Sequence, residues 1–309
     1  MTAAVLLLFT AALSVVAAFV SVTVVAALAL GTRRLGVLAP AARARVLLAA
    51  AVAPALAGLT CAAAVLADIE FFGCHAHHCR ARHAGAPPSL LVLVLAIAAL
   101  VRVGGALVQA ARNARRSALV CRFLRTAGQQ QEPNVLPLEE PQAFVVGLLR
   151  PRVYVSRGLV GAHAEADLEV VMAHEHAHVR RRDPLRRLLA SVALAFHVPG
   201  IAGWLERHIV RAQEMAADAD AARAVHDAPR VAEALVRMAR LRVRRPALVA
   251  WLGDHLEARV QALLDGAPGS DRPGSSTLVA AAAVALALGI AAAEPIHWGA
   301  ETLFRLLAG

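Results

Sequence analysis

The sequence predicts a mainly α-helical protein that crosses a membrane several times and carries a smaller α+β domain on the inner face. Three observations support this fold class. Hydrophobic residues make up 59% of the 309-residue chain and the mean hydropathy is +0.59, whereas soluble domains are about half apolar. Four long stretches are almost free of charge, and arginines cluster between them.

Each of these stretches is long enough for a membrane-spanning helix, which needs about 20 mostly apolar residues. They are Thr2–Leu30, Val46–Ala67, Pro88–Ala110 and Ser275–Ala293. The third contains a single charged residue, Arg102, whose side chain is expected to extend toward one membrane face. The first has no basic residue before it and is too long for a secretory signal peptide.

The positions of the arginines predict how these spans are oriented, because loops rich in basic residues stay on the cytoplasmic side. Residues Gly31–Arg45 hold four arginines and no acid, and five more lie between Arg112 and Arg125. Both regions are therefore expected inside the cell, with the N-terminus and C-terminus outside. The net charge of +10 is accounted for by this topology, and the sequence predicts no direct contact with nucleic acid.

Three regions follow from this topology. Residues 1–110 are expected to form three transmembrane helices with an extracytoplasmic loop at 68–87. Residues 111–273 form a cytoplasmic domain, and residues 274–309 form a fourth transmembrane helix with a short outer tail. The protein is thus predicted to be a multi-pass protein of the cell membrane, with the lipid bilayer as one of its partners.

The outer loop contains CHAHHCRARH, from Cys74 to His83. Outside the cytoplasm Cys74 and Cys79 can form a disulfide. The same cysteines can instead bind a transition metal together with the histidines of the loop, which are His75, His77, His78 and His83. The spacing supports both interpretations, and either would suit a sensor.

The stretch AHEHAHVRRRDP, Ala173–Pro184, holds the densest group of ionisable side chains. Apolar residues recur at helical spacing around it, so an amphipathic helix is expected; they are Leu168, Val171, Met172 and Val179. Successive helical residues turn by roughly 100°. His174 and His178 therefore share one face, about 40° apart, whereas His176 points roughly 200° away from His174.

His174, Glu175 and His178 form the pattern H-E-x-x-H. Two neutral imidazoles one turn apart can bind one zinc ion, and Glu175 can accept a proton from a water that the ion acidifies. The prediction is a hydrolase of peptide bonds with one Zn²⁺ per chain and Glu175 as the catalytic base. The alternatives are a helix with solvated histidines and a non-catalytic, metal-responsive membrane sensor.

A catalytic zinc ion takes three protein ligands and keeps one position open. Glu214 and Asp218 lie one turn apart within Arg211–Val225. We expect Glu214 to be the third ligand and Asp218 to accept the outer ring N–H of a ligating histidine. An exposed acidic helix face is the alternative for both residues. The competing third ligands are Asp183, His197, Glu206 and His208.

The apolar run Leu188–Leu205 separates these two groups and is interrupted at Pro199. If it crossed the bilayer once, Glu214 and His178 would lie on opposite sides and could not share a metal. The run is therefore expected to return to the same face. It forms either a helical hairpin in the domain core or one that dips into the membrane boundary.

Two short strands are expected before this region, Ala143–Leu148 and Arg152–Ser156, joined at Arg150-Pro151. The edge of such a hairpin can hold an extended substrate by backbone pairing, and ordinary packing is the alternative. Tyr154, the single tyrosine of the chain, is expected to pack inside its strand.

Four motifs then occur in a familiar order: GLLRPRVYVSRGL at Gly147–Leu159, HEHAHVRRRDP, FHVP at Phe196–Pro199, and EMAAD at Glu214–Asp218. Together they resemble the membrane metallopeptidases typified by the BlaR/MecR antibiotic-sensing signal transducers. The resemblance covers Phe144 to about Val225 and the layout of three spans before and one after. HtpX-like membrane proteases share the core motifs and are a close second.

The resemblance implies a zincin-like peptidase domain of the gluzincin type on the cytoplasmic face. His174, His178 and Glu214 would be its zinc ligands and Glu175 its general base. It also implies regulated proteolysis of a protein or peptide substrate, such as a winged-helix transcriptional repressor. The antibiotic sensors carry a penicillin-binding domain after the last span, whereas only Glu294–Gly309 follows here. Sensing of β-lactams by that route is therefore not supported.

Overall fold

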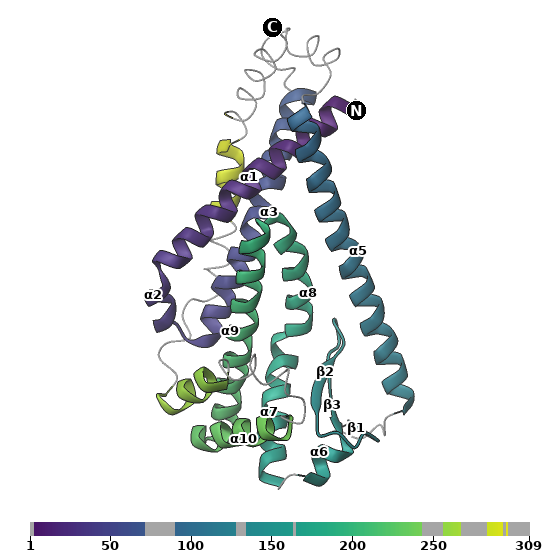
Figure 1. Cartoon of the computed structure of the whole chain (residues 1–309), viewed down its shortest axis with the longest axis vertical. Coiled ribbons are helices and arrows are strands. Elements are labelled where there is room, and N and C mark those ends of the chain that lie inside the picture. Colours follow the sequence, from purple (N-terminus) through teal and green to yellow (C-terminus); the bar gives the residue numbers. More distant parts are fainter. Residues whose placement is uncertain are drawn as a thin grey trace.

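Long runs of alanine, leucine and valine form the three longest helices of the computed structural model. They are α1 (Ala3–Leu30), α3 (Pro40–Phe71) and α5 (Leu90–Ala127), with the short α2 (Thr32–Val37) between the first two. The three long helices meet at the narrow end of a wedge, and α5 then diverges from the other two (Figure 1). The broad end of the wedge holds a small sheet with helices α6, α7 and α10, and α8 and α9 run from there toward the narrow end (Figure 1).

The structure describes residues 3–71, 90–127, 134–162, 165–242, 256–266, 283–292 and 295. The Cys/His loop, with Cys74, His75, His77, His78 and Cys79, lies outside these residues. The expected outer tail, apart from residue 295, lies outside them too. The disulfide and metal interpretations of the loop therefore remain predictions.

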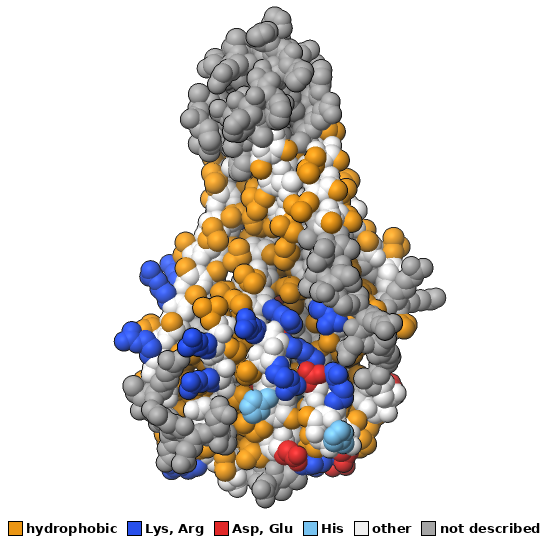
Figure 2. Space-filling view, turned by 180° about the vertical axis from the view of Figure 1, so that it is seen from behind, with side chains coloured by type: hydrophobic (Ala, Val, Ile, Leu, Met, Phe, Trp, Pro, Cys, Tyr) orange, Lys and Arg blue, Asp and Glu red, His pale blue; other side chains and the backbone are white. Residues whose placement is uncertain are grey.

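Within the described residues, Leu13–Leu30 and Pro40–Ala64 are long and apolar enough to cross a bilayer, and Ala283–Ala292 is a shorter apolar helix. The third expected span lies within α5, and the fourth lies partly outside the described residues. The exposed side chains of the narrow half are mostly hydrophobic, and a band of arginines separates this half from the broad, mixed-charge end (Figure 2). These features suggest a membrane protein.

Small residues let these helices approach closely. A Cβ on Gly58 of α3 would lie 2.8 Å from the carbonyl oxygen of Leu13 in α1, and one on Gly289 would lie 2.5 Å from that of Ala57. Close backbone contact at small residues is how helices associate where lipid replaces water. Here it holds α1 and the last described helix against α3.

The sheet has the strand order β1-β3-β2, with β1 at Asn134–Leu136, β2 at Ala143–Val146 and β3 at Arg152–Ser156. The antiparallel pairing of β2 with β3 confirms the expected hairpin, although its first strand ends at Val146, two residues early. The parallel strand β1 lies in a segment without a strand-like pattern. Tyr154 is 1% exposed and packs against Phe144, as expected.

The helices α6 (Arg157–Ala162), α7 (Glu165–Arg181), α8 (Asp183–Ala193), α9 (Pro199–Val225) and α10 (Ala228–Arg242) follow the sheet. A single 3-10 turn, η1 (Leu194–Phe196), links α8 to α9. The expected hairpin is therefore present, and Pro199 starts its second helix, where a proline needs no N–H partner. Because α8 and α9 are antiparallel, the chain returns to the level of α7. His178 and Glu214 therefore lie at the same end of the hairpin.

The tip of this hairpin is held by all three long helices. His197 is fully buried there: its Nδ1 accepts from the Ser21 hydroxyl of α1 at 2.9 Å, and its Nε2 donates to the carbonyl oxygen of Ala51 in α3 at 3.1 Å. Arg102 of α5 donates to the carbonyl oxygen of His197. The side chain of Arg102, expected to extend toward one membrane face, thus supplies the donor that this turn carbonyl needs.

Apolar packing joins the hairpin to the long helices as well. One hydrophobic cluster contains Leu28 of α1, Leu47 of α3, Leu194 of η1, and Leu205 and Ile209 of α9. Helices α8 and α9, the second of which carries Glu214, are therefore built into the same core as the candidate spans.

Candidate active site

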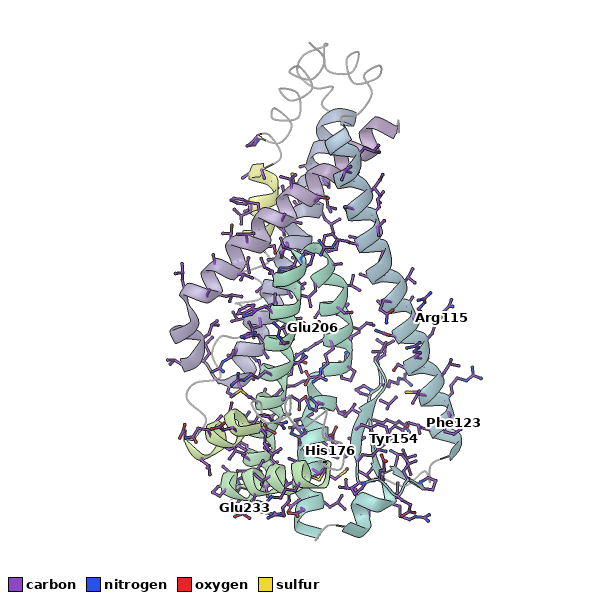
Figure 3. The ribbon with its side chains drawn as sticks, in the orientation of Figure 1. Arg115, Phe123, Tyr154, His176, Glu206 and Glu233 are labelled. Atoms are coloured by element: carbon purple, nitrogen blue, oxygen red, sulfur yellow. The ribbon has the colours of Figure 1, made fainter. Side chains whose placement is uncertain are left out.

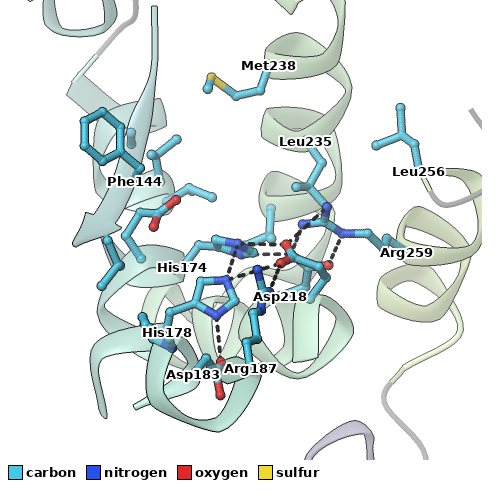
Figure 4. Close-up of a pocket in the computed structure, with 18 of the residues that line it drawn as sticks. Phe144, His174, His178, Asp183, Arg187, Asp218, Leu235, Met238, Leu256 and Arg259 are labelled. Carbon is cyan, nitrogen blue, oxygen red and sulfur yellow. Dashed lines mark hydrogen bonds and ion pairs between the residues drawn. The ribbon is translucent and has the colours of Figure 1, made fainter. Parts of the chain in front are cut away.

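A cavity of about 670 Å³ lies in the broad half of the molecule, at the junction of β2 with helices α7 to α10 (Figure 4). Its size is within the usual range for ligand pockets. One wall is apolar and includes Phe144, Leu148, Leu235 and Met238, while the other carries charged side chains from α7, α8 and α9. An apolar trough beside convergent polar groups is the usual form of a binding or catalytic site.

Two histidines of α7 face this cavity. The neighbouring side of the helix is fixed by Leu168 and Val179, which pack in a core shared with the sheet, and Val171 of the same core also lines the cavity. His174 and His178 consequently project together, and their Nε2 atoms are 3.2 Å apart. Helical periodicity therefore accounts for the pair.

Glu214 of α9 completes the group. Its Oε2 is 3.6 Å from His174 Nε2, and its Oε1 is 3.7 Å from His178 Nε2. Donor atoms bound at about 2.1 Å around a tetrahedral zinc ion are separated by about 3.4 Å. The two short contacts use different oxygens of Glu214, and one donor atom from each of the three side chains lies within 4.8 Å of the other two, so the group could hold a metal ion.

A second layer of carboxylates stands behind the histidines. The Nδ1 of His178 donates to Asp183 Oδ2 at 2.7 Å, and the Nδ1 of His174 lies 3.0 Å from Asp218 Oδ1, although that contact is poorly aligned for a hydrogen bond. With protons on both Nδ1 atoms, both Nε2 lone pairs face the same point, beside the carboxylate of Glu214. A metal ion or a shared proton can occupy that point, and outer carboxylates of this kind orient metal-binding histidines.

The charges around the histidines also favour a positive charge between His174, His178 and Glu214. Burial alone lowers the pKa of His174, but Asp218 and Glu214 outweigh it and raise that pKa to about 10. Burial raises the pKa of the Glu214 carboxyl, yet His174, His178 and Arg259 hold it well below its ordinary value. Glu214 is therefore ionised, and in the absence of a metal a proton on His174 supplies the positive charge.

Two arginines border the group. Arg259, in the helix at 256–264, donates to both oxygens of Asp218 at 2.6 and 2.7 Å. Burial raises the pKa of Asp218, but Arg259 and then His174 lower it by more, so the pKa lies below its ordinary value. On the other side, Arg187 of α8 lies 2.7 Å from Glu214. The guanidinium groups thus fix Glu214 and Asp218, the two acidic side chains of α9 next to the histidines.

Glu175 lines the same cavity beside His174 and is half-buried. His176 is exposed and is not part of the cavity wall, as its helical angle predicts; Figure 3 shows it at the lower end of the molecule. The arrangement leaves one carboxylate next to the three donor atoms without a direct role in holding them.

The competing third ligands lie elsewhere. His197 is in the hairpin tip, and His208 donates to the carbonyl oxygen of Trp204 at 2.8 Å. Glu206 lines the far end of the cavity but is not in the metal-binding group. Asp183 contacts His178 from behind and lies 3.7 Å from Arg186. Of the five acidic or histidine candidates, Glu214 alone joins His174 and His178 among the described residues.

Sequence reasoning missed Arg259 and the role of Asp183. Arg259 comes 41 residues after Asp218 and resembles the other arginines of an arginine-rich region. Asp183 was expected only as a competing third ligand. It contacts His178 from behind because Arg182 adopts a left-handed conformation, with φ of 54°, between α7 and α8. Neither residue has a distinguishing signal in a single sequence.

Comparison with known proteins gives one match. The family model described as BlaR1 peptidase M56 matches residues 86–263, which is more than half of the chain and includes the whole metal-binding group. No curated protein and no solved structure matches the chain.

Proposed function

Because the chain belongs to the BlaR1 peptidase M56 family, we propose that it is a zinc-dependent endopeptidase anchored in a membrane by its apolar helices. The observation that carries this proposal is the convergence of His174 Nε2, His178 Nε2 and Glu214 within 3.2 to 3.7 Å of one another. Two imidazoles and one carboxylate form a ligand set common in zinc peptidases, with one position left for water or substrate.

The side chains divide the work of peptide hydrolysis. His174, His178 and Glu214 would hold the ion, and Asp183 and Asp218 fix the orientation of the two imidazole rings. Zinc, when bound, acidifies a water and polarises a carbonyl group. Glu175 accepts the proton of the attacking water and passes it to the leaving amine.

The cavity wall provides the substrate-binding surface. Phe144 and Val145 of β2 line the cavity together with Glu175 of α7. A substrate polypeptide that lies between β2 and α7 is therefore held against Glu175. Extended binding along a strand uses backbone groups and leaves the side chains to adjacent pockets. This arrangement supports action on polypeptides.

We further propose that the protein spans the membrane several times, with the catalytic half in the cytoplasm and both termini outside. The support is the placement of arginine: those of Gly31–Arg45 and those of residues 111–273 would be cytoplasmic. Resemblance to the BlaR/MecR transducers suggests regulated proteolysis, with a winged-helix repressor as one substrate. Quality control of membrane proteins is the HtpX-like alternative.

A non-catalytic metal sensor is the remaining alternative, and Glu175→Gln separates it from an enzyme. The full-length protein is purified in detergent, loaded with zinc and assayed for cleavage of itself and of unfolded protein chains. Loss of a positioned general base should reduce the rate by about 10²- to 10⁴-fold with zinc still bound. His176→Gln, one residue away and exposed, is the matched control. If Glu175→Gln cleaves as fast as the parent, the protein does not use Glu175 as its base.

A further inference from the structure

The metal-binding group lies next to the end of a candidate span. A cavity of about 310 Å³ behind the site is lined by Gly36, Pro40 and Arg43 on one side and by Met215, Asp218 and Arg259 on the other. Pro40 is the first residue of the apolar stretch Pro40–Ala64, and Asp218 lies behind His174. The end of α3 and the outer carboxylate of the site are therefore opposite walls of one small cavity.

The same short separation is seen along α9. Ala212 is buried in the core that α9 shares with α1 and α3, and Glu214 follows it by two residues, a rise of about 3 Å. Arg207 and Arg211 are exposed on this part of α9. Arginines gather where a bilayer ends on its inner side, as in the band across the middle of the molecule (Figure 2). Glu214 thus lies about one helical turn below that boundary.

The main cavity extends from the site toward this boundary. Its wall in that direction is formed by Arg187, Leu188 and Ser191 of α8, Glu206 of α9 and Asn113 of α5. From Asp183 to Ser191 the helix rises about 12 Å toward the hairpin tip. In Figure 3, Glu206 lies well above His176, at about the height of Arg115.

From this placement, and resting on the proposed peptidase function, we propose that the enzyme cleaves the juxtamembrane segment of polypeptides that are themselves anchored in the same membrane. The substrate enters between α5 and α8 as an extended chain. At about 3.4 Å per extended residue, the 12 Å path along α8 holds about four residues. The scissile bond therefore lies about four to eight residues from the end of the anchor of the substrate.

The test uses the full-length protein, loaded with zinc in proteoliposomes, with three reporters that carry the same unfolded 40-residue casein segment. The first joins it directly to a transmembrane helix, the second inserts a 20-residue Gly-Ser spacer, and the third has no anchor. Mass spectrometry locates the cuts. A spacer of this length spans only about 25 Å, so membrane co-localisation alone predicts a loss of a few-fold.

We expect cuts within about ten residues of the anchor in the first reporter, and rates at least about tenfold lower for the spaced and free reporters. Rates within threefold of one another for all three would overturn the juxtamembrane proposal while leaving the peptidase function intact. If the zinc-loaded protein cuts none of the reporters and Glu175→Gln behaves identically, the peptidase function itself fails.

Two tryptophan substitutions on α8 test the path. Ser191→Trp narrows the cavity on its membrane side, about two turns from the ligands, and should slow cleavage of the anchored reporter by at least about tenfold with zinc affinity unchanged. Leu189→Trp is the matched control, because Leu189 is 55% exposed and is not part of the cavity wall. Equal rates for Ser191→Trp and the parent would show that substrates do not follow this path.

Discussion

Asp218→Asn is the sharpest test of how the metal site is supported. The Asp218 side chain is almost fully buried, lies 3.0 Å from His174 and accepts two hydrogen bonds from Arg259. Asparagine keeps the shape but removes the negative charge. The imidazole of His174 then loses the carboxylate that orients it and makes its Nε2 more basic.

The structure indicates two separable effects. Loss of an outer carboxylate typically weakens metal binding by about 10- to 100-fold, which corresponds to about 1.4 to 2.7 kcal/mol. In addition, the Arg259 side chain is only 16% exposed. It would be left without its main partner, at a cost of about 3 to 5 kcal/mol to the folded state. Both zinc affinity and stability should therefore fall.

The two effects are measured on full-length protein in detergent, by competition with a chromophoric chelator and by thermal unfolding with and without zinc. Asp218→Asn combined with Arg259→Gln should recover much of the stability but not the zinc affinity. Asp227→Asn, exposed beyond the end of α9, is the control. A folded Asp218→Asn protein that binds zinc within twofold of the parent would refute the supporting role of Asp218.

Three further outcomes are expected. In metal-free protein the pKa of His174 is raised from 6.5 to about 10. The charged ring therefore stabilises the fold fully below about pH 6.5, and this stabilisation is lost as the pH rises toward 10. Denaturant unfolding between pH 6 and 10, in the presence of a chelator, measures the decline in the free energy of unfolding. Gly158→Ala should destabilise by about 1 to 3 kcal/mol, because its Cβ would lie 1.8 Å from the carbonyl oxygen of Glu139; a melting curve records this. Ser21→Ala should cost a similar amount by leaving Nδ1 of buried His197 without its donor, as measured by unfolding in detergent.

Each of these has a matched comparison. His174→Gln should flatten the decline in stability between pH 6.5 and 10, and an unchanged slope would contradict the assigned cause. Gly161→Ala has open space around its Cβ and should be tolerated. Ser14→Ala removes only a bond to a carbonyl of its own helix, so equal losses for Ser14→Ala and Ser21→Ala would argue against the hairpin contact.

The sequence was most informative where one physical rule acts alone. Hydropathy located α1 and α3, and helical periodicity placed His174 and His178 together and His176 apart. The one-turn spacing of Glu214 and Asp218 indicated the third ligand, and the requirement that all ligands of one metal share a side of the membrane predicted the hairpin of α8 and α9. Each inference needed only local spacing or a simple topological constraint.

The rest depended on long-range packing. Because α5 contains no proline, it continues as one helix to Ala127, past the point where composition changes from apolar to charged. β1 is a three-residue strand whose partner β3 lies 20 residues away, so local pattern cannot reveal it. The left-handed Arg182 and the pairing of Arg259 with Asp218 are likewise products of the assembled fold.

The hairpin tip held at His197 bears on when this protein can become active. The chain is made from its N-terminus, so α1 and α3 leave the ribosome before the helices that carry the ligands. Without those two helices, Leu194, Leu205 and Ile209 would face water. Helices α8 and α9 would then lose the packing that holds them in position. The metal-binding group of a newly made chain can therefore come together only after α1 and α3 have packed against the hairpin, so the order of folding decides when the site first exists.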